Sequence, residues 1–191
     1  MKKTVSLGIA LAMFGAATAS ANEYESRLSA LAQAEIAAIA SSPQVIEAIR
    51  AQNAETASFG QPKIDELDQT WRAEVGSSGQ TMISEVLGRS ASQYLSDQRE
   101  ASAGLFTEIF VMDGKGLNVA QSDVTSDYWQ GDEAKWQDTF GQGPGAIHIS
   151  EIEEDESTQT FQSQVSMTIV DPDNGAAIGA ITVGVNIEMI E

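Results

Sequence analysis

The sequence predicts an α+β fold, in which a long N-terminal helix and further helices pack on a five-stranded antiparallel sheet. Apolar residues recur at helical spacing through the first half of the chain, whereas strand-like runs separated by turn signals fill the second half. A small-residue stretch ending at Gly104 separates the halves. We therefore expect a helical region over residues 22–104 and a sheet region over residues 105–191, which together form one domain.

The N-terminus is typical of a cleavable signal peptide covering residues 1–21. Lys2 and Lys3 precede an apolar stretch that is shorter than the roughly 20 residues needed to cross a bilayer, and residues 19–21 form a small-x-small cleavage site. Cleavage after Ala21 leaves 170 of the 191 residues, and no later apolar stretch reaches spanning length. We therefore expect an exported, periplasmic protein.

The charge balance is strongly acidic. The chain has 28 Asp and Glu against 10 Lys and Arg, and loss of the signal peptide changes the net charge from −18 to −20. Such a charge repels nucleic acid and anionic membranes, so we expect neither as a partner. The chain contains no cysteine, which excludes disulfides, thiol nucleophiles and thiolate metal sites.

Three helices are predicted in the first half. Apolar residues three and four apart indicate one long helix over residues 23–56, kinked at Ser42 and Pro43, which suit an N-cap and a first helical position. A second helix is expected around residues 64–71. A third is expected over residues 83–99.

Five strands are predicted in the second half. Their ranges are residues 105–112, 117–121, 145–152, 160–170 and 177–187. The segments DGKG at 113–116 and DPDNG at 171–175 are typical of tight turns. The last two strands alternate between an aliphatic face, which we expect against the long helix, and a small, polar face, which either meets solvent or leaves room for a guest.

Three segments of the chain resemble a single Cache domain, a PAS-like (PDC-type) extracytoplasmic sensor module. They are VMDGKGLNVAQS in the first two strands, TSDYWQGDEAKW after them, and the closing hairpin TIVDPDNGAAIGAITVGVNIE. The resemblance implies that a ligand binds between the sheet and a cap over residues 122–140. Unlike receptors of this family, the sequence shows no membrane helix after the domain and no output domain.

The resemblance implies a ligand site in and near this cap. Its aromatic rings would wall the pocket, its aspartates would hold an ammonium group and its lysine a carboxylate, while a histidine and a glutamine would reach in from the third and fourth strands. These residues are Asp127, Tyr128, Trp129, Asp132, Lys135, Trp136, His148 and Gln164.

Each of these residues also has a purely structural interpretation. Trp129 and Trp136 are seven residues apart and suit one side of a short helix packed on the core. Asp132 suits a helix cap, and Asp127 suits a loop that bonds its own backbone. His148, the one histidine, suits an ordinary strand position.

Other chemistry finds little support in the sequence. The acidic runs at 151–156 and 171–174 offer oxygen ligands for calcium, but neither has EF-hand spacing and both suit solvated turns. The chain lacks a nucleophile-elbow motif and a phosphate-binding glycine loop. We therefore predict no catalytic residue, no metal and no cofactor.

The function predicted from these observations is that of a periplasmic sensor-domain protein. It would bind a small polar metabolite, such as an amino acid, an amine or a small carboxylate, and report to a membrane sensor kinase or chemoreceptor. The alternatives are a ligand-free protein-interaction module and, less favoured, a hydrolase. The long N-terminal helix is a candidate homodimer contact. The ligand, the partner and the oligomeric state are not specified by the sequence.

Overall fold

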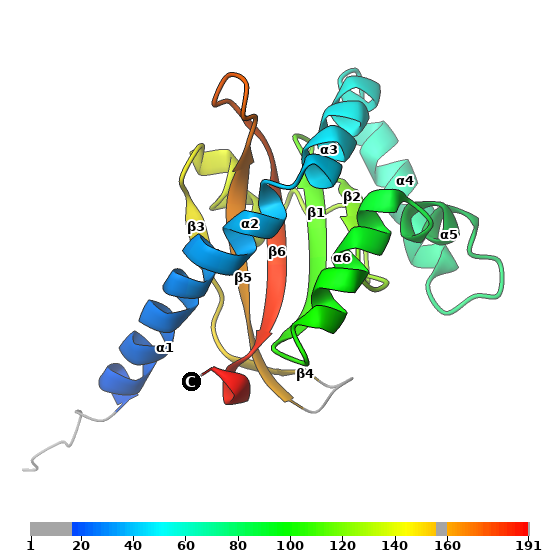
Figure 1. Cartoon of the computed structure of the whole chain (residues 1–191). Coiled ribbons are helices and arrows are strands. Elements are labelled where there is room, and N and C mark those ends of the chain that lie inside the picture. The colour runs from blue at the N-terminus through cyan, green and yellow to red at the C-terminus, as the bar shows by residue number, and fades with distance from the viewer. Residues whose placement is uncertain (1–16, 156–159, 191) are drawn as a thin grey trace, which may run out of the picture.

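A computed structural model describes residues 17–155 and 160–190 of the chain. Five antiparallel strands follow one another in the sheet in the order β2-β1-β6-β5-β3 (Figure 1). Their bounds are Phe106–Asp113 for β1, Asn118–Gln121 for β2, Ile147–Ile149 for β3, Thr160–Val170 for β5 and Ala177–Asn186 for β6. A short additional strand, β4 (Glu153–Asp155), pairs with the start of β5. The predicted α+β class and antiparallel sheet are thus confirmed, and the predicted third strand is shorter than expected.

The long N-terminal helix is present and kinked where the sequence predicts. It comprises α1 (Ala17–Leu31), a π-helical turn η1 (Ala32–Ile36), α2 (Ala37–Ala40) and α3 (Pro43–Thr56). Ser42 leaves the helical conformation with ψ of 142°, and its Oγ accepts a hydrogen bond from the Val45 N–H at 3.4 Å. Most of the predicted signal peptide, residues 1–16, lies outside the described residues, and residues 17–21 belong to α1.

The helix predicted over residues 83–99 is two helices, which corrects the prediction. The chain forms α4 (Gln61–Glu74), α5 (Thr81–Leu87) and α6 (Ser90–Ala101). Gly88 ends α5, and Arg89 is extended with ψ of 145°. The break allows the Arg89 guanidinium to reach the Val119 carbonyl of β2, a contact that local periodicity does not reveal.

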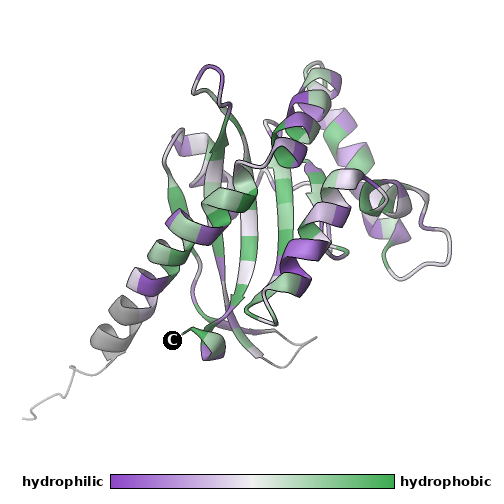
Figure 2. Cartoon of the chain, in the orientation of Figure 1, coloured by the Kyte–Doolittle hydropathy of each residue, from purple (hydrophilic) through white to green (hydrophobic). Residues whose placement is uncertain are grey.

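The aliphatic face of the sheet packs on the long helix, as predicted. Figure 2 shows that β1, which lies between β2 and β6, is hydrophobic over most of its length. The largest core cluster joins the helices to the inner strands and includes Leu28, Ile36, Ile39, Ile49, Val165, Ile181, Val183 and Val185. Phe161, at the start of β5, alternates with the same aliphatic residues but is 47% exposed. Within the described residues, no helix combines the length and apolarity needed to cross a membrane.

The opposite face of the sheet carries the cap. The cap contains α7 (Ala134–Gln137) and the 3-10 turn η2 (Phe140–Gln142), and a further 3-10 turn, η3 (Ile187–Met189), follows β6. Trp136 and Phe140 stack at 5.0 Å between ring centroids and pack on buried Phe110 and Met112 of β1. This small apolar contact holds the cap on a face that is otherwise rich in small and polar side chains.

Candidate ligand site between the sheet and the cap

The turn between β1 and β2 is organised around a buried carboxylate. Asp113 Oδ1 accepts the backbone N–H groups of Lys115 at 2.8 Å and Leu117 at 3.0 Å. Its Oδ2 accepts from Gln52 Nε2 at 3.2 Å and from Thr56 Oγ1 at 2.9 Å. Because the four donors satisfy a fully buried carboxylate, the turn is fixed both to itself and to α3.

The segment after β2 is fixed to this turn by hydrogen bonds. Gln130 N–H donates to the Gly116 carbonyl at 2.8 Å, and Trp129 Nε1 donates to the Lys115 carbonyl at 2.9 Å. Gly116 has φ of +81°, and a Cβ placed on it would lie 2.5 Å from the Cα of Gly131. The two glycines therefore allow an approach that no larger residue permits.

A second anchor comes from α4. One carboxylate oxygen of Asp68 accepts the N–H groups of Tyr128 at 2.9 Å and Trp129 at 3.1 Å. Arg72 then bridges Asp68 at 2.6 Å and Asp127 at 3.0 Å. Asp127 also accepts a short hydrogen bond from the Gln130 amide. These contacts order the start of the cap before α7 begins.

A cavity of about 330 Å³ lies between the cap and the polar face of the sheet. We call it the sheet–cap pocket. Its lining residues are Glu133, Ala134, Lys135, His148, Ser150, Glu153, Gln162 and Gln164. The cap contributes the first three, and the other five come from β3, β4, β5 and the segment between β3 and β4.

Charged groups of both signs meet in this pocket. The Lys135 ammonium pairs with Glu133 at 2.9 Å and lies 5.4 Å from the centre of the Phe110 ring. Its side chain is only 16% exposed. His148 Nδ1 lies 3.5 Å from Asp138, a contact that becomes an ion pair when the imidazole is protonated.

The strands supply neutral hydrogen-bonding groups opposite the cap. Gln164 Nε2 donates to Glu108 at 2.8 Å, and Gln162 Oε1 accepts from Thr107 Oγ1 at 2.5 Å. Ser166 and Thr182 share a buried hydrogen bond of 2.9 Å deeper on the same face. The neighbouring Thr168 hydroxyl is buried with no hydrogen-bond partner found in the structure. The face therefore provides oriented amides and hydroxyls for a polar guest.

The structure brings together three of the eight predicted site residues. Lys135, His148 and Gln164 line the sheet–cap pocket. Trp136 lies beside them under the cap, where its Nε1 donates to the Asp113 carbonyl at 3.1 Å. Exposed Asp132 lies in the turn before α7.

The remaining three residues do not line the sheet–cap pocket. Asp127 and Trp129 make the anchoring contacts described above. Tyr128 stacks on Trp71 of α4 at 5.4 Å between ring centroids and lines a different cavity, among the helices.

Sequence reasoning missed four polar residues that line the pocket. They are Glu133, Ser150, Glu153 and Gln162. Gln162 shares the polar face of its strand with Gln164, so the alternation already pointed to it. Glu133 and Glu153 had no such signal, because their positions depend on how the cap and β4 fold over the sheet. In the described part of the chain, no three acidic or histidine side chains are grouped to hold a metal ion.

Comparison with known proteins finds similarity among solved structures alone. No protein-family model and no curated protein matches the chain. The Escherichia coli DcuS sensor domain is 14% identical, with a TM-score of 0.49, over 86% of this chain and 95% of that one. The architecture of a long N-terminal helix, five antiparallel strands and a helix between the second and third strands is present. The chain therefore has the arrangement of helices and strands that the sequence predicted.

Two further structures are similar over more of this chain. The Vibrio cholerae histidine kinase DctB sensor domain is 12% identical, with a TM-score of 0.41, over 91% of this chain and 58% of that one. The ligand-binding domain of the Campylobacter jejuni chemoreceptor Tlp3, in complex with L-norvaline, is 12% identical, with a TM-score of 0.42, over 93% and 65%. The chain thus spans about three-fifths of these two domains.

Proposed function

We propose that this chain is a periplasmic sensor-type domain that binds a small polar metabolite in the sheet–cap pocket. The observation that carries the proposal is the convergence of Lys135 and His148 with Gln162 and Gln164 around one cavity of about 330 Å³. Binding pockets of this size hold small molecules, and a few well-placed polar groups set their specificity.

The lining groups favour a ligand that carries a carboxylate, an amino group or both. Lys135 would donate to a ligand carboxylate, and its ammonium group lies 5.4 Å from the centre of the Phe110 ring. Glu133 and Glu153 would accept from a ligand ammonium group. The Gln164 amide, already oriented by Glu108, would fix the ligand on the sheet side.

The first test is a thermal-shift screen of the chain from residue 22 against amino acids, amines and small carboxylates. We expect at least one of them to raise the melting temperature, since a ligand that binds only the folded state stabilises it by mass action. The Lys135→Met variant should lose this response. Lys115→Met, the same change in the neighbouring turn and outside the pocket, should keep it.

Two outcomes would contradict the proposal. If no compound stabilises the wild-type chain, the predicted alternative of a ligand-free interaction module becomes the better description. If Lys135→Met and a second variant, His148→Leu, both retain the wild-type response, the ligand does not use the sheet–cap pocket. Isothermal titration calorimetry with the strongest compound provides the affinity for either comparison.

The location and the partner belong to the same proposal. We propose export with cleavage after Ala21, which N-terminal sequencing of the secreted chain would test. A ligand-bound domain of this kind would report to a membrane sensor kinase or chemoreceptor, and it acts by binding and not by catalysis. Contact between two copies through α1 is tested by light scattering of the cleaved and uncleaved chains.

A further inference from the structure

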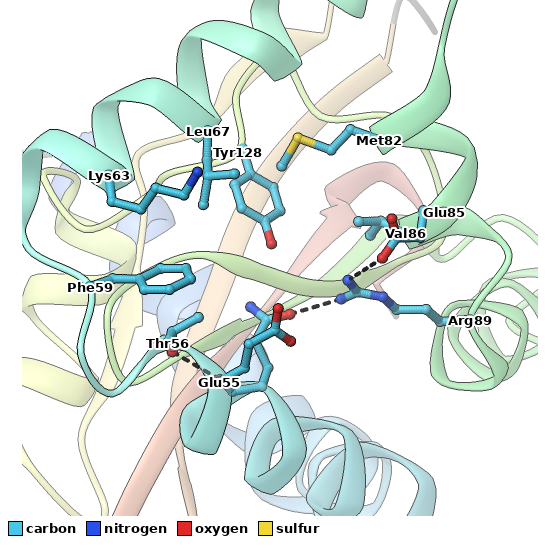
Figure 3. A pocket seen from close by; sticks show the side chains of 11 residues that line it. Glu55, Thr56, Phe59, Lys63, Leu67, Met82, Glu85, Val86, Arg89 and Tyr128 are labelled. Carbon is cyan, nitrogen blue, oxygen red and sulfur yellow. Dashed lines mark hydrogen bonds and ion pairs between the residues drawn. The ribbon is translucent and has the colours of Figure 1, made fainter.

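A second cavity, of about 270 Å³, lies among the helices beyond the edge strand β2 (Figure 3). We call it the helix pocket. It is walled by α3, α4 and α5 and by Tyr128, and it shares no described lining residue with the sheet–cap pocket. We propose that the helix pocket is a separate binding site for an amino acid with an apolar side chain, held as a zwitterion.

The cationic end of this site is a guanidinium fixed by buried partners. Arg89 Nη1 donates to Gln52 Oε1 and to the Val119 carbonyl, both at 2.8 Å. Gln52 is 6% exposed and is itself held by Asp113. Arg89 Nη2 makes a looser ion pair with Glu85, at 3.6 Å. Because the Glu85 side chain is 73% exposed, a ligand carboxylate can replace it at little cost.

A tyrosine hydroxyl completes the carboxylate end. Tyr128 is 5% exposed, and its hydroxyl points into the cavity in Figure 3. Burial raises the pKa of Tyr128 to about 12, partly offset by nearby Arg89. The hydroxyl therefore keeps its proton at neutral pH and can donate to a carboxylate beside the guanidinium.

Carboxylates from two other helices face the same space. Glu55 of α3 and Glu85 of α5 line the cavity, and both can accept from a ligand ammonium group. Lys63 of α4 reaches the opposite wall. The lining therefore carries two carboxylates and two cationic side chains, although the whole chain has 28 acidic against 10 basic residues. A neutral zwitterion complements such a lining better than an anion or a cation does.

Apolar side chains form the rest of the wall. Phe59, Leu67 and Met82 are partly buried and pack on the core cluster that contains Trp71 and Val86. They line the cavity together with the charged groups, so they suit the hydrocarbon part of a ligand whose charged end faces Arg89 and Glu55. The sheet–cap pocket, lined almost wholly by polar residues, offers no comparable wall. This contrast separates the two ligand classes.

The test is isothermal titration of the chain from residue 22 with L-leucine as the probe. We expect saturable binding of L-leucine. N-acetyl-L-leucine, which lacks the ammonium group, leucinamide, which lacks the carboxylate, and glycine, which lacks the apolar side chain, should each bind at least tenfold more weakly. Glu55→Gln should weaken binding at least tenfold, and Met82→Trp should abolish it by filling the cavity. Glu47→Gln, the same change at an exposed position of α3 outside the pocket, should bind as the wild type does.

The sheet–cap variant Lys135→Met separates this inference from the proposed function. Binding of L-leucine that survives Lys135→Met but not Glu55→Gln supports the helix pocket. Binding lost in Lys135→Met and kept in both helix-pocket variants overturns it and assigns L-leucine to the sheet–cap pocket. Absence of L-leucine binding, or equal binding of leucinamide, also overturns it and leaves the sheet–cap proposal to its own screen.

Discussion

Substitution of Gly116 by alanine tests how the cap segment is pinned to the β1–β2 turn. Gly116 has φ of +81°, and an added Cβ would lie 2.5 Å from Gly131 Cα and 2.6 Å from Gly131 N. A left-handed conformation costs a non-glycine residue about 1–2 kcal/mol. Forcing two backbones apart adds about 1–3 kcal/mol, the range for overpacked cores. We therefore expect Gly116→Ala to lower the free energy of unfolding by about 2–5 kcal/mol.

The matched control is Gly175→Ala in the β5–β6 turn. Gly175 has a similar φ of +73°, but an added Cβ there meets nothing within 4 Å. This variant therefore isolates the backbone term, and we expect a loss of about 1–2 kcal/mol. Urea unfolding followed by tryptophan fluorescence measures both variants. For a domain of this size, about 2–4 °C of melting temperature corresponds to each kcal/mol.

The result that would refute this reasoning is equal destabilisation of the two variants. It would mean that the backbones at Gly116 and Gly131 can separate without a loss of stability, so that their contact does not hold the cap in place. Trp129 provides an independent readout, because its Nε1 donates to the Lys115 carbonyl beside the contact. A separated turn should expose this indole and shift its emission to longer wavelength in Gly116→Ala alone.

Three further predictions follow from buried or paired groups. Asp113→Asn replaces an acceptor of four hydrogen bonds and should cost about 2–4 kcal/mol in urea unfolding, whereas the exposed Asp97→Asn should change stability by less than about 0.5 kcal/mol. Tyr128 has a pKa of about 12 in the folded protein against an ordinary 10.0, so it binds its proton more tightly when the chain is folded. The free energy of unfolding should therefore fall as the pH rises from about 10 to 12, and Tyr128→Phe should remove this fall. Arg50 holds the pKa of Asp171 below its ordinary 3.8, so the stability this pair adds is present above that value and lost as pH falls further, and Asp171→Asn should remove that acid dependence.

Local sequence patterns predicted most of the secondary structure because the signals are themselves local. The kink at Ser42 depends on a cap and a proline that are adjacent in the chain. The alternation in β5 and β6 directly reports which side chains face the helices. The break at Gly88 was missed because its cause lies elsewhere. Arg89 leaves the helix to reach Gln52 and Val119, each about 30 or more residues away.

The candidate site was predicted less completely for the same reason. The sequence analysis placed the residues around Tyr128 in one cap and predicted that they line one pocket. In the structure, Asp68, 60 residues upstream, accepts the Tyr128 N–H and turns this ring toward the helices. Lys135 and Trp136 follow only after the Gly131 turn and face the sheet. A side chain's destination thus depended on a distant carboxylate that no periodicity in the segment reveals.

Both cavities are connected by hydrogen bonds to Asp113, and this connection decides whether their ligands can influence each other. Gln52 links Arg89 of the helix pocket to Asp113, and the Asp113 carbonyl accepts from Trp136 in the cap. Such a connection transmits binding energy only if the turn between the cavities has two arrangements that the ligands favour differently. Asp113 has all four of its donors in the observed arrangement, and a shifted turn would leave a buried carboxylate short of partners. We therefore expect ligands at the two sites to raise the free energy of unfolding additively, and a coupling above about 1 kcal/mol would show that the turn moves.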